Sequence, residues 1–219
     1  MLAAERRKME QEELKASRIK HILECTYDLF SNGIDPVTMD KIADNAEIGV
    51  ASLYRYFSTK DQLAIEVATF AWKQEQELFA KNFNTEQYNA LSGLEQVHTL
   101  LNIFPNMFET EGKFFRFVYY FDAYIKRERV PPQQLTQYEA AIIGTQKMMM
   151  DAIAKGKTDG SLQTGSMTND ELYFTATHAL FSLAQKLSLS GEMLYMDKST
   201  SGKRQLELLV TIILKSLKD

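Results

Sequence analysis

The chain has 219 residues, of which 45% are hydrophobic and 25% charged; this suits one large domain or a small domain fused to a medium one and excludes disorder throughout. The formal net charge is −4, whereas nucleic-acid-binding domains usually carry excess positive charge. Any contact with nucleic acid therefore depends on a local cluster of cationic side chains. A single cysteine excludes an intrachain disulfide. The first residues are charged and lack the apolar core of a signal peptide, and no apolar run reaches membrane-spanning length. These features predict a cytoplasmic protein with no membrane partner.

The first part of the chain predicts four helices separated by short breaks. Residues 1–15 carry charges of both signs and predict a helical extension, which leads into an amphipathic helix that ends before Gly33. Thr38 is the expected N-cap of the next, short helix. The expected ranges are about 16–32, 38–45, 49–56 and 58–79.

The remainder also predicts only helices. Pro105 is expected to kink or break one of them, and Pro131-Pro132 to end another. The expected helices cover about 85–108, 113–129, 134–155, 170–189 and 204–217, with a polar, glycine-rich loop at 157–169. Because prolines and glycines are scarce and no segment predicts a strand, the predicted fold class is all-α, with about nine helices.

Residues 38–63 have the pattern of a helix-turn-helix. Such a unit needs two short helices joined by a tight turn, the second able to enter the major groove and the first bracing it. Ala43 is small where the helices must cross, and the apolar contacts that fix the crossing are expected from Ile42, Ile48, Leu53 and Phe57. The alternative, two packed helices of an ordinary core, leaves the polar cluster 54–56 beside Lys60 without a role.

The outward face of the second short helix predicts contacts with DNA. Val50 and Ala51 can touch a thymine methyl group, and Arg55 can reach a guanine edge. Hydroxyl and cationic side chains suit phosphate oxygens, and those expected to serve are Thr38, Lys41, Ser52, Tyr54, Tyr56 and Lys60.

This stretch resembles the signature of the TetR family, which reads T-x-x-x-I-A-x-x-A, then a recognition helix ending in L-Y-x-Y-F, then K-D/E-x-L. The matching residues here are Thr38, Ile42, Ala43, Ala46, 53–57 and 60–63. The resemblance implies a helix-turn-helix DNA-binding domain of three helices over 1–62, with 1–15 as an N-terminal extension. A long helix would join it to an all-helical effector-binding and dimerisation domain over 63–219.

The resemblance also implies residue roles in DNA binding. It implies phosphate contacts for Thr38, Tyr54, Tyr56 and Lys60, and base contacts for Asp40, Val50, Ala51, Ser52 and Arg55. Two positions depart from the family pattern. Glu47 stands at a turn position often held by glycine, and Gly49 replaces the usual serine or threonine cap of the recognition helix, a weaker N-cap.

The C-terminal part is rich in aromatic and methionine side chains. Aromatic residues occur on nearly every face of the helix expected at 113–129, more than one buried stripe requires. They either fill a core or line an apolar cavity, and the resemblance implies a cavity occupied by an inducer. The candidate ligand-binding residues are Phe104, Met107, Phe108, Phe117, Tyr120, Phe121, Tyr124, Met149 and His178, the last of which is alternatively an ordinary core histidine.

The two closing helices are amphipathic beyond what a terminal hairpin needs. The resemblance implies that they form a two-fold, four-helix dimer interface, which would place two reading heads at successive major grooves. The alternative is that they only cap the monomer. The candidate dimerisation residues are Phe174, Phe181, Leu206, Val210 and Ile213.

Other chemistry is not expected. His21 and Cys25 lie four residues apart on one helix, but the sequence offers no third metal ligand, and no phosphate loop or nucleophile motif occurs. We therefore expect no enzyme, metal or cofactor.

The leading hypothesis is a ligand-responsive transcriptional regulator, specifically a repressor. It would bind a palindromic operator in double-stranded DNA as a homodimer and take a small apolar or amphipathic effector. A constitutive DNA-binding dimer and a helical protein that does not bind DNA are the alternatives.

Overall fold

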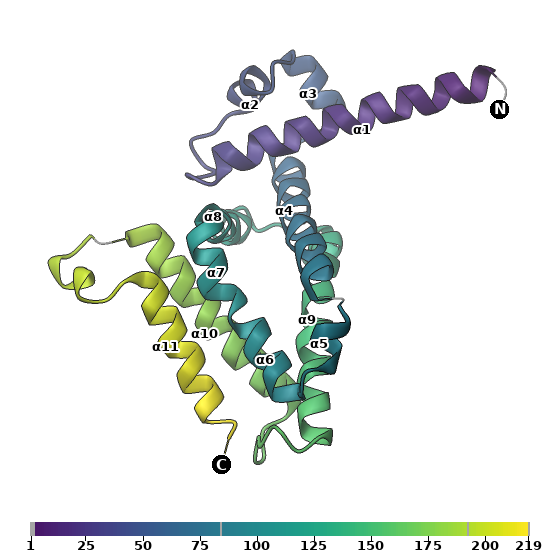
Figure 1. Ribbon diagram of the computed structural model, residues 1–219. Coiled ribbons are helices and arrows are strands. Elements are labelled where there is room, and N and C mark those ends of the chain that lie inside the picture. The colour runs from purple at the N-terminus through teal and green to yellow at the C-terminus, as the bar shows by residue number, and fades with distance from the viewer. Residues whose placement is uncertain (1–2, 84, 192, 219) are drawn as a thin grey trace. The chain divides into compact units, whose positions relative to one another are not determined.

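The computed structural model describes residues 3–83, 85–191 and 193–218, and the described chain contains helices and no strands (Figure 1). The all-α fold class is thereby confirmed. The α-helices are α1 Ala3–Phe30, α2 Met39–Asn45, α3 Val50–Tyr56, α4 Lys60–Phe83, α5 Glu86–Ala90, α6 Gly93–Leu101, α7 Ile103–Thr110, α8 Gly112–Glu128, α9 Thr136–Thr158, α10 Asn169–Ser190 and α11 Gly202–Lys215, with 3-10 turns η1 Pro132–Leu135 and η2 Tyr195–Ser199. None of these helices is long and apolar enough to cross a membrane.

The described chain divides into two compact units. The first contains the residues up to Trp72 together with Phe117–Tyr138, and the second contains Lys73–Arg116 and the residues from Glu139 onward. Helices α4, α8 and α9 therefore each contribute to both units, whereas the sequence placed a single boundary after residue 62.

The first unit is built around the buried faces of α1, α2 and α3. Helix α1 packs on α2, and α2 packs on α3. The second half of α8 adds aromatic side chains to the same core: Phe117 meets Tyr27 of α1 edge to face, with ring centroids 5.0 Å apart, and stacks on Phe121. Burial of such rings is a main source of stability in a small domain.

The second unit packs α11 on α7 and α10, and α7 on α6 and α10. Its aromatic cluster, Phe104, Phe114, Phe115 and Phe181, has three rings around Phe181 at centroid distances of 5.2–6.4 Å. The start of α6 lies against α9, because a Cβ atom at Gly93 would come within 2.0 Å of the backbone nitrogen of Gly156.

Local capping explains where the expected helix over 85–108 differs from the structure. Thr85 caps α5, and Ser92 forms a capping box with Glu95 that starts α6 afresh. The second break falls at Asn102, not at Pro105. Pro105 lies in the first turn of α7, where a missing N–H removes no intrahelical hydrogen bond.

Candidate nucleic-acid interface and ligand-binding body

The helix-turn-helix is closed by local interactions that the sequence predicted. The Thr38 hydroxyl accepts a hydrogen bond from the Lys41 backbone N–H at 3.2 Å, which confirms Thr38 as the N-cap of α2. Gly49 caps α3 without a side-chain hydrogen bond. In the turn between them, Glu47 has a φ of +53°, so a side-chain-bearing residue occupies the left-handed region where glycine is favoured.

The inner side of this motif is fully packed. Ile42, Ala43 and Leu53 have no exposed surface, and Phe57 is also buried. These four side chains were expected to set the crossing of α2 and α3; Ile48, which was expected to join them, is half-buried. A recognition helix with its apolar residues fixed in this way can present its other side to DNA as a rigid surface.

The outer side carries the residues predicted to touch DNA. Tyr54 is 50% exposed, and Arg55 beside it is also exposed. The Arg55 guanidinium donates to the hydroxyl of Ser52 at 2.8 Å, a surface contact between neighbours one turn apart. Of the ten candidates, Thr38, Asp40, Lys41, Ala51, Tyr54 and Arg55 are exposed, and Val50, Ser52, Tyr56 and Lys60 are half-buried.

Lys60 differs from the other candidates because its ammonium group is held by two backbone carbonyls and lies beside an aromatic ring. It donates to the backbone carbonyls of Ile34 and Asp35, at 2.7 and 3.2 Å, and lies 5.4 Å from the centroid of the Tyr124 ring. Burial lowers the pKa of the Lys60 ammonium. Lys60 therefore braces the loop between α1 and α2 in this structure, and contact with a phosphate requires it to turn outward.

Tyr124 and Arg127 of α8 complete a polar cluster that we call the latch, formed by Asp35, Lys60, Asp61, Tyr124 and Arg127. The Tyr124 hydroxyl donates to the Asp61 carboxylate at 2.5 Å. Arg127 forms an ion pair with Asp35 and lies 5.3 Å from the Tyr124 ring centroid. The latch joins the end of α8 to the start of α4 and to the loop before α2.

The latch also shifts the protonation of its members. Burial and the hydrogen bond to Asp61 raise the pKa of the Tyr124 hydroxyl, so it stays a proton donor at neutral pH. The Arg127 guanidinium lowers the pKa of the Asp35 carboxyl. The sequence had assigned Tyr124 to a ligand cavity and had not singled out Arg127 or Asp35, because no local pattern connects residues about ninety positions apart.

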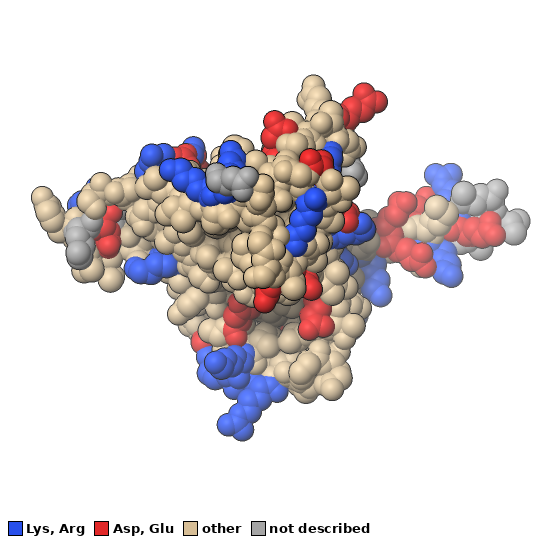
Figure 2. All heavy atoms as spheres, turned by 90° about the horizontal axis from the view of Figure 1, so that it is seen from below, with Lys and Arg blue, Asp and Glu red and all other residues tan. Residues whose placement is uncertain are grey.

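The N-terminal extension carries both signs of charge. Residues 5–18 of α1 are exposed, and Arg6 pairs with Glu10 at 2.9 Å along the helix. Figure 2 shows acidic and basic side chains intermixed on this segment. The extension thus adds no concentrated positive charge to the candidate DNA-binding surface.

The candidate ligand-binding residues are not brought together at one place. Phe117, Tyr120, Phe121 and Tyr124 belong to the first unit, and the rings of Phe117 and Phe121 are buried in its core. In the second unit, Phe104 joins the aromatic cluster, while His178 is exposed and lies beside the ring of Phe174. Met107 and Phe108 are half-buried on α7, and Met149 is buried.

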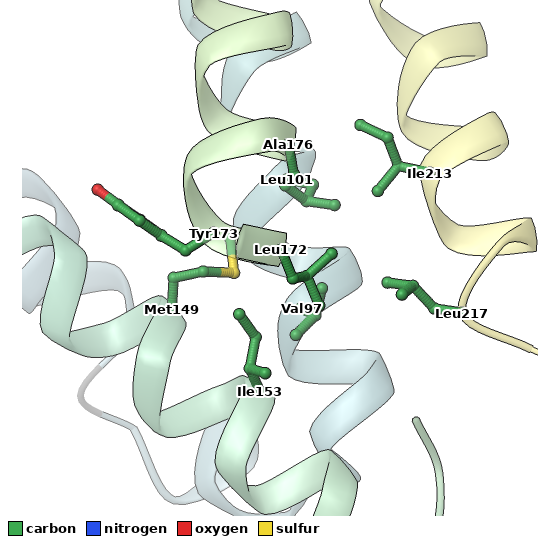
Figure 3. A pocket seen from close by; sticks show the side chains of 9 residues that line it. All are labelled: Val97, Leu101, Met149, Ile153, Leu172, Tyr173, Ala176, Ile213 and Leu217. Carbon is green, nitrogen blue, oxygen red and sulfur yellow. The ribbon is translucent and has the colours of Figure 1, made fainter. Parts of the chain in front are cut away.

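A small apolar cavity lies in the second unit between α6, α9, α10 and α11 (Figure 3). Its volume is about 10 Å³, roughly the space of one water molecule. Figure 3 shows aliphatic side chains and the Met149 sulfur around it, with the Tyr173 hydroxyl directed away from the others. The lining residues are Val97, Leu101, Met149, Ile153, Leu172, Tyr173, Ala176, Ile213 and Leu217.

The closing helices divide the candidate dimerisation residues between core and surface. Leu206 and Val210 are buried inside their own monomer, because the amphipathic stripe of α11 that carries them packs on α7 and α10. Phe181 and Ile213 are half-buried and Phe174 is exposed. The exposed apolar residues of α11 are instead Leu208 and Ile212, which the same helical spacing could have identified as a second stripe.

No group of three or more potential metal ligands occurs among the described residues. The sulfur of Cys25 lies 3.7 Å from Nε2 of His21, and burial raises the pKa of the thiol, which disfavours the thiolate form that binds metal.

Comparisons with known proteins agree with this geometry. Residues 22–67 match the family model described as bacterial regulatory proteins, tetR family. No curated protein sequence matches the chain. Among solved structures, FadR of Bacillus subtilis in complex with stearoyl-CoA is 10% identical with a TM-score of 0.68, covering 90% of this chain and 98% of that one. The MbdR regulator of Azoarcus sp. CIB is 20% identical with a TM-score of 0.64, covering 92% of this chain and all of its own.

The ketosteroid regulator KstR2 of Mycobacterium tuberculosis is 17% identical with a TM-score of 0.61, covering 92% of this chain and 95% of its own. At these identities the solved structures establish the fold, and the family model adds the helix-turn-helix signature over α2 and α3. The segment that contains α2 and α3 is thus similar to the tetR family of bacterial regulatory proteins, and the fold of the chain is that of the solved regulators.

Proposed function

We propose that this chain is a ligand-responsive repressor that binds a palindromic operator as a homodimer. The observation that carries the proposal is the placement of Tyr54 and Arg55 on the exposed side of α3, directly over the buried Leu53 and Phe57. A side chain held in this way can reach base edges in the major groove, where arginine pairs with guanine.

Dimerisation is proposed through the outer faces of α10 and α11. Phe174, Leu208 and Ile212 expose apolar surface there, and Ile212 is 63% exposed. Contact between the same faces of two copies would generate a two-fold axis, and two recognition helices would then reach half-sites about one helical turn of DNA apart.

Effector control is proposed through the second unit. The structural neighbour FadR was solved with stearoyl-CoA, which supports a small-molecule ligand for a body of this fold. Binding would change the distance between the two reading heads, so that both no longer fit successive grooves. Such a switch requires the ligand to prefer one of the two arrangements.

A constitutive DNA-binding dimer is the second candidate, favoured by the small size of the apolar cavity. About 10 Å³ accommodates no effector without rearrangement of the surrounding helices. The two candidates predict different responses of the melting temperature to added compounds. An effector that binds the folded state raises the melting temperature, whereas a protein with a filled core and no effector site shows no such rise.

Selection of bound duplexes from a random pool tests the DNA-binding part. We expect a palindrome with half-sites about ten base pairs apart. Arg55→Ala should weaken binding to the selected operator by about 1–3 kcal/mol and relax the preference at one base pair of each half-site. Lys147→Ala, which removes an exposed cation from α9, is the matched control. Equal binding by both variants would contradict the assigned role of Arg55.

A further inference from the structure

Lys60 is the first residue of α4, and backbone carbonyls of the loop before α2 hold its ammonium group. The group donates to the carbonyl of Ile34 at 2.7 Å and to that of Asp35 at 3.2 Å. Ile34 is only 2% exposed, so the loop that carries these carbonyls is anchored in the core of the first unit. The two contacts occupy two of the three N–H donors of the ammonium group and keep it against the protein.

The other members of the latch fix the same loop from α8. The Asp35 carboxylate forms an ion pair with Arg127, whose guanidinium lies 5.3 Å from the centroid of the Tyr124 ring. The Tyr124 hydroxyl donates in turn to the carboxylate of Asp61, which follows Lys60 in the chain. The contacts thus form a closed ring that starts and ends at the first turn of α4. A connected network of this kind can be worth more than the sum of its separate pairs.

The partners of the charged groups in the latch differ in strength. The carboxylates of Asp35 and Glu128 both pair with Arg127, whereas the Lys60 ammonium group donates to uncharged carbonyls. A phosphate oxygen carries negative charge and attracts an ammonium group more strongly than an uncharged carbonyl does. Lys60 is also one of the side chains expected to contact the DNA backbone. Duplex DNA would therefore compete with the loop carbonyls for this group.

We propose that the latch withholds the Lys60 ammonium group from DNA phosphate, and that Asp35 and Arg127 are positioning residues that set how readily it is released. Lys60 then has two arrangements, one on the loop carbonyls and one on the DNA backbone. Loosening the latch favours the second arrangement and strengthens operator binding. This inference rests on the proposed function, because it concerns the affinity of the same helix-turn-helix for its operator.

A charge-neutral double variant tests the proposal. Asp35→Ala combined with Arg127→Ala removes the ion pair of the latch without changing the net charge, and both side chains are about half exposed. Operator binding should become about two- to fivefold tighter per protomer, the range that corresponds to loss of an exposed ion pair. Lys147→Ala combined with Asp151→Ala, which removes an exposed ion pair of α9, is the matched control and should leave binding unchanged. Unchanged or weaker binding by the latch variant overturns the proposal.

Lys60→Ala then assigns the gain to the ammonium group. Added to the latch variant, it should abolish the gain and lower the slope of log affinity against log salt concentration by about one per protomer. A gain that persists in the presence of Lys60→Ala, or a salt slope that does not change, overturns the proposal, because the tighter binding then comes from another group. Should the double variant fail to fold, Asp35→Asn replaces it, with Asp44→Asn at an exposed position of α2 as the charge control.

The position of Lys60 is measured separately without DNA. Its ammonium nitrogen lies 5.4 Å from the centroid of the Tyr124 ring, so the ring current of Tyr124 displaces the NMR shift of the adjacent methylene protons. In the latch variant this shift should move toward that of the exposed Lys41, and an identical shift in both chains overturns the proposal.

The two levels of the argument fail in different ways. Absence of duplex binding by every variant refutes the repressor and, with it, the competition for phosphate. Operator binding that does not respond to the latch variant refutes the role of the latch alone.

Discussion

Replacement of Glu75 by glutamine should make the stability of the protein less sensitive to pH. The carboxyl group is 6% exposed, and its pKa in the folded chain is about 7 compared with a usual value of 4.5. The folded state therefore binds the proton more tightly than the unfolded state does. Any destabilisation by Glu75 is absent below about pH 4.5, grows as the pH rises and is complete above pH 7.

The size of the effect follows from the shift. A difference of about 2.5 pKa units, from 4.5 to about 7, corresponds to roughly 3 kcal/mol, of which most appears between about pH 5 and pH 8. Glutamine has nearly the same shape and no charge. The free energy of unfolding of Glu75→Gln relative to the native chain should therefore increase by about 2–3 kcal/mol over that range of pH.

Urea denaturation of three proteins at several pH values measures this. The native chain, Glu75→Gln and Glu77→Gln are compared, and the exposed Glu77 serves as the control for loss of one negative charge from the same helix. The reasoning is refuted if the difference between Glu75→Gln and the native chain is the same at pH 5 and pH 8, or if Glu77→Gln shows an equal change.

Three further substitutions probe the fold and the proposed dimer. Glu47→Gly should stabilise the chain by about 0.5–1 kcal/mol, because glycine accepts the positive φ without strain; a loss of stability in thermal denaturation would contradict this. Ile212→Glu should convert a dimer into a folded monomer in analytical ultracentrifugation, whereas Thr211→Glu at a neighbouring exposed position is the control for added charge; a dimer that persists in Ile212→Glu argues against the α10–α11 face. Tyr124→Phe removes the hydrogen bond to Asp61 and should lower the free energy of unfolding by about 1–2 kcal/mol; an unchanged urea midpoint would show that the bond contributes nothing.

The helix-turn-helix could be predicted in detail because its determinants are local. The Thr38 cap, the special turn position at Glu47 and the buried Leu53 each depend on residues within a few positions of one another. A motif that encodes both its capping and its packing within about 25 residues leaves little to distant contacts.

The partners of the aromatic residues could not be predicted in the same way. Helical spacing indicates that Phe117 and Phe121 face a core, but it does not indicate which helix supplies the other side. In the structure that helix is α1, through Tyr27, so the second half of α8 belongs to the first unit, which also contains the helix-turn-helix. The burial of Glu75 was not predicted either, because a single acidic residue in a charged helix gives no local sign of burial.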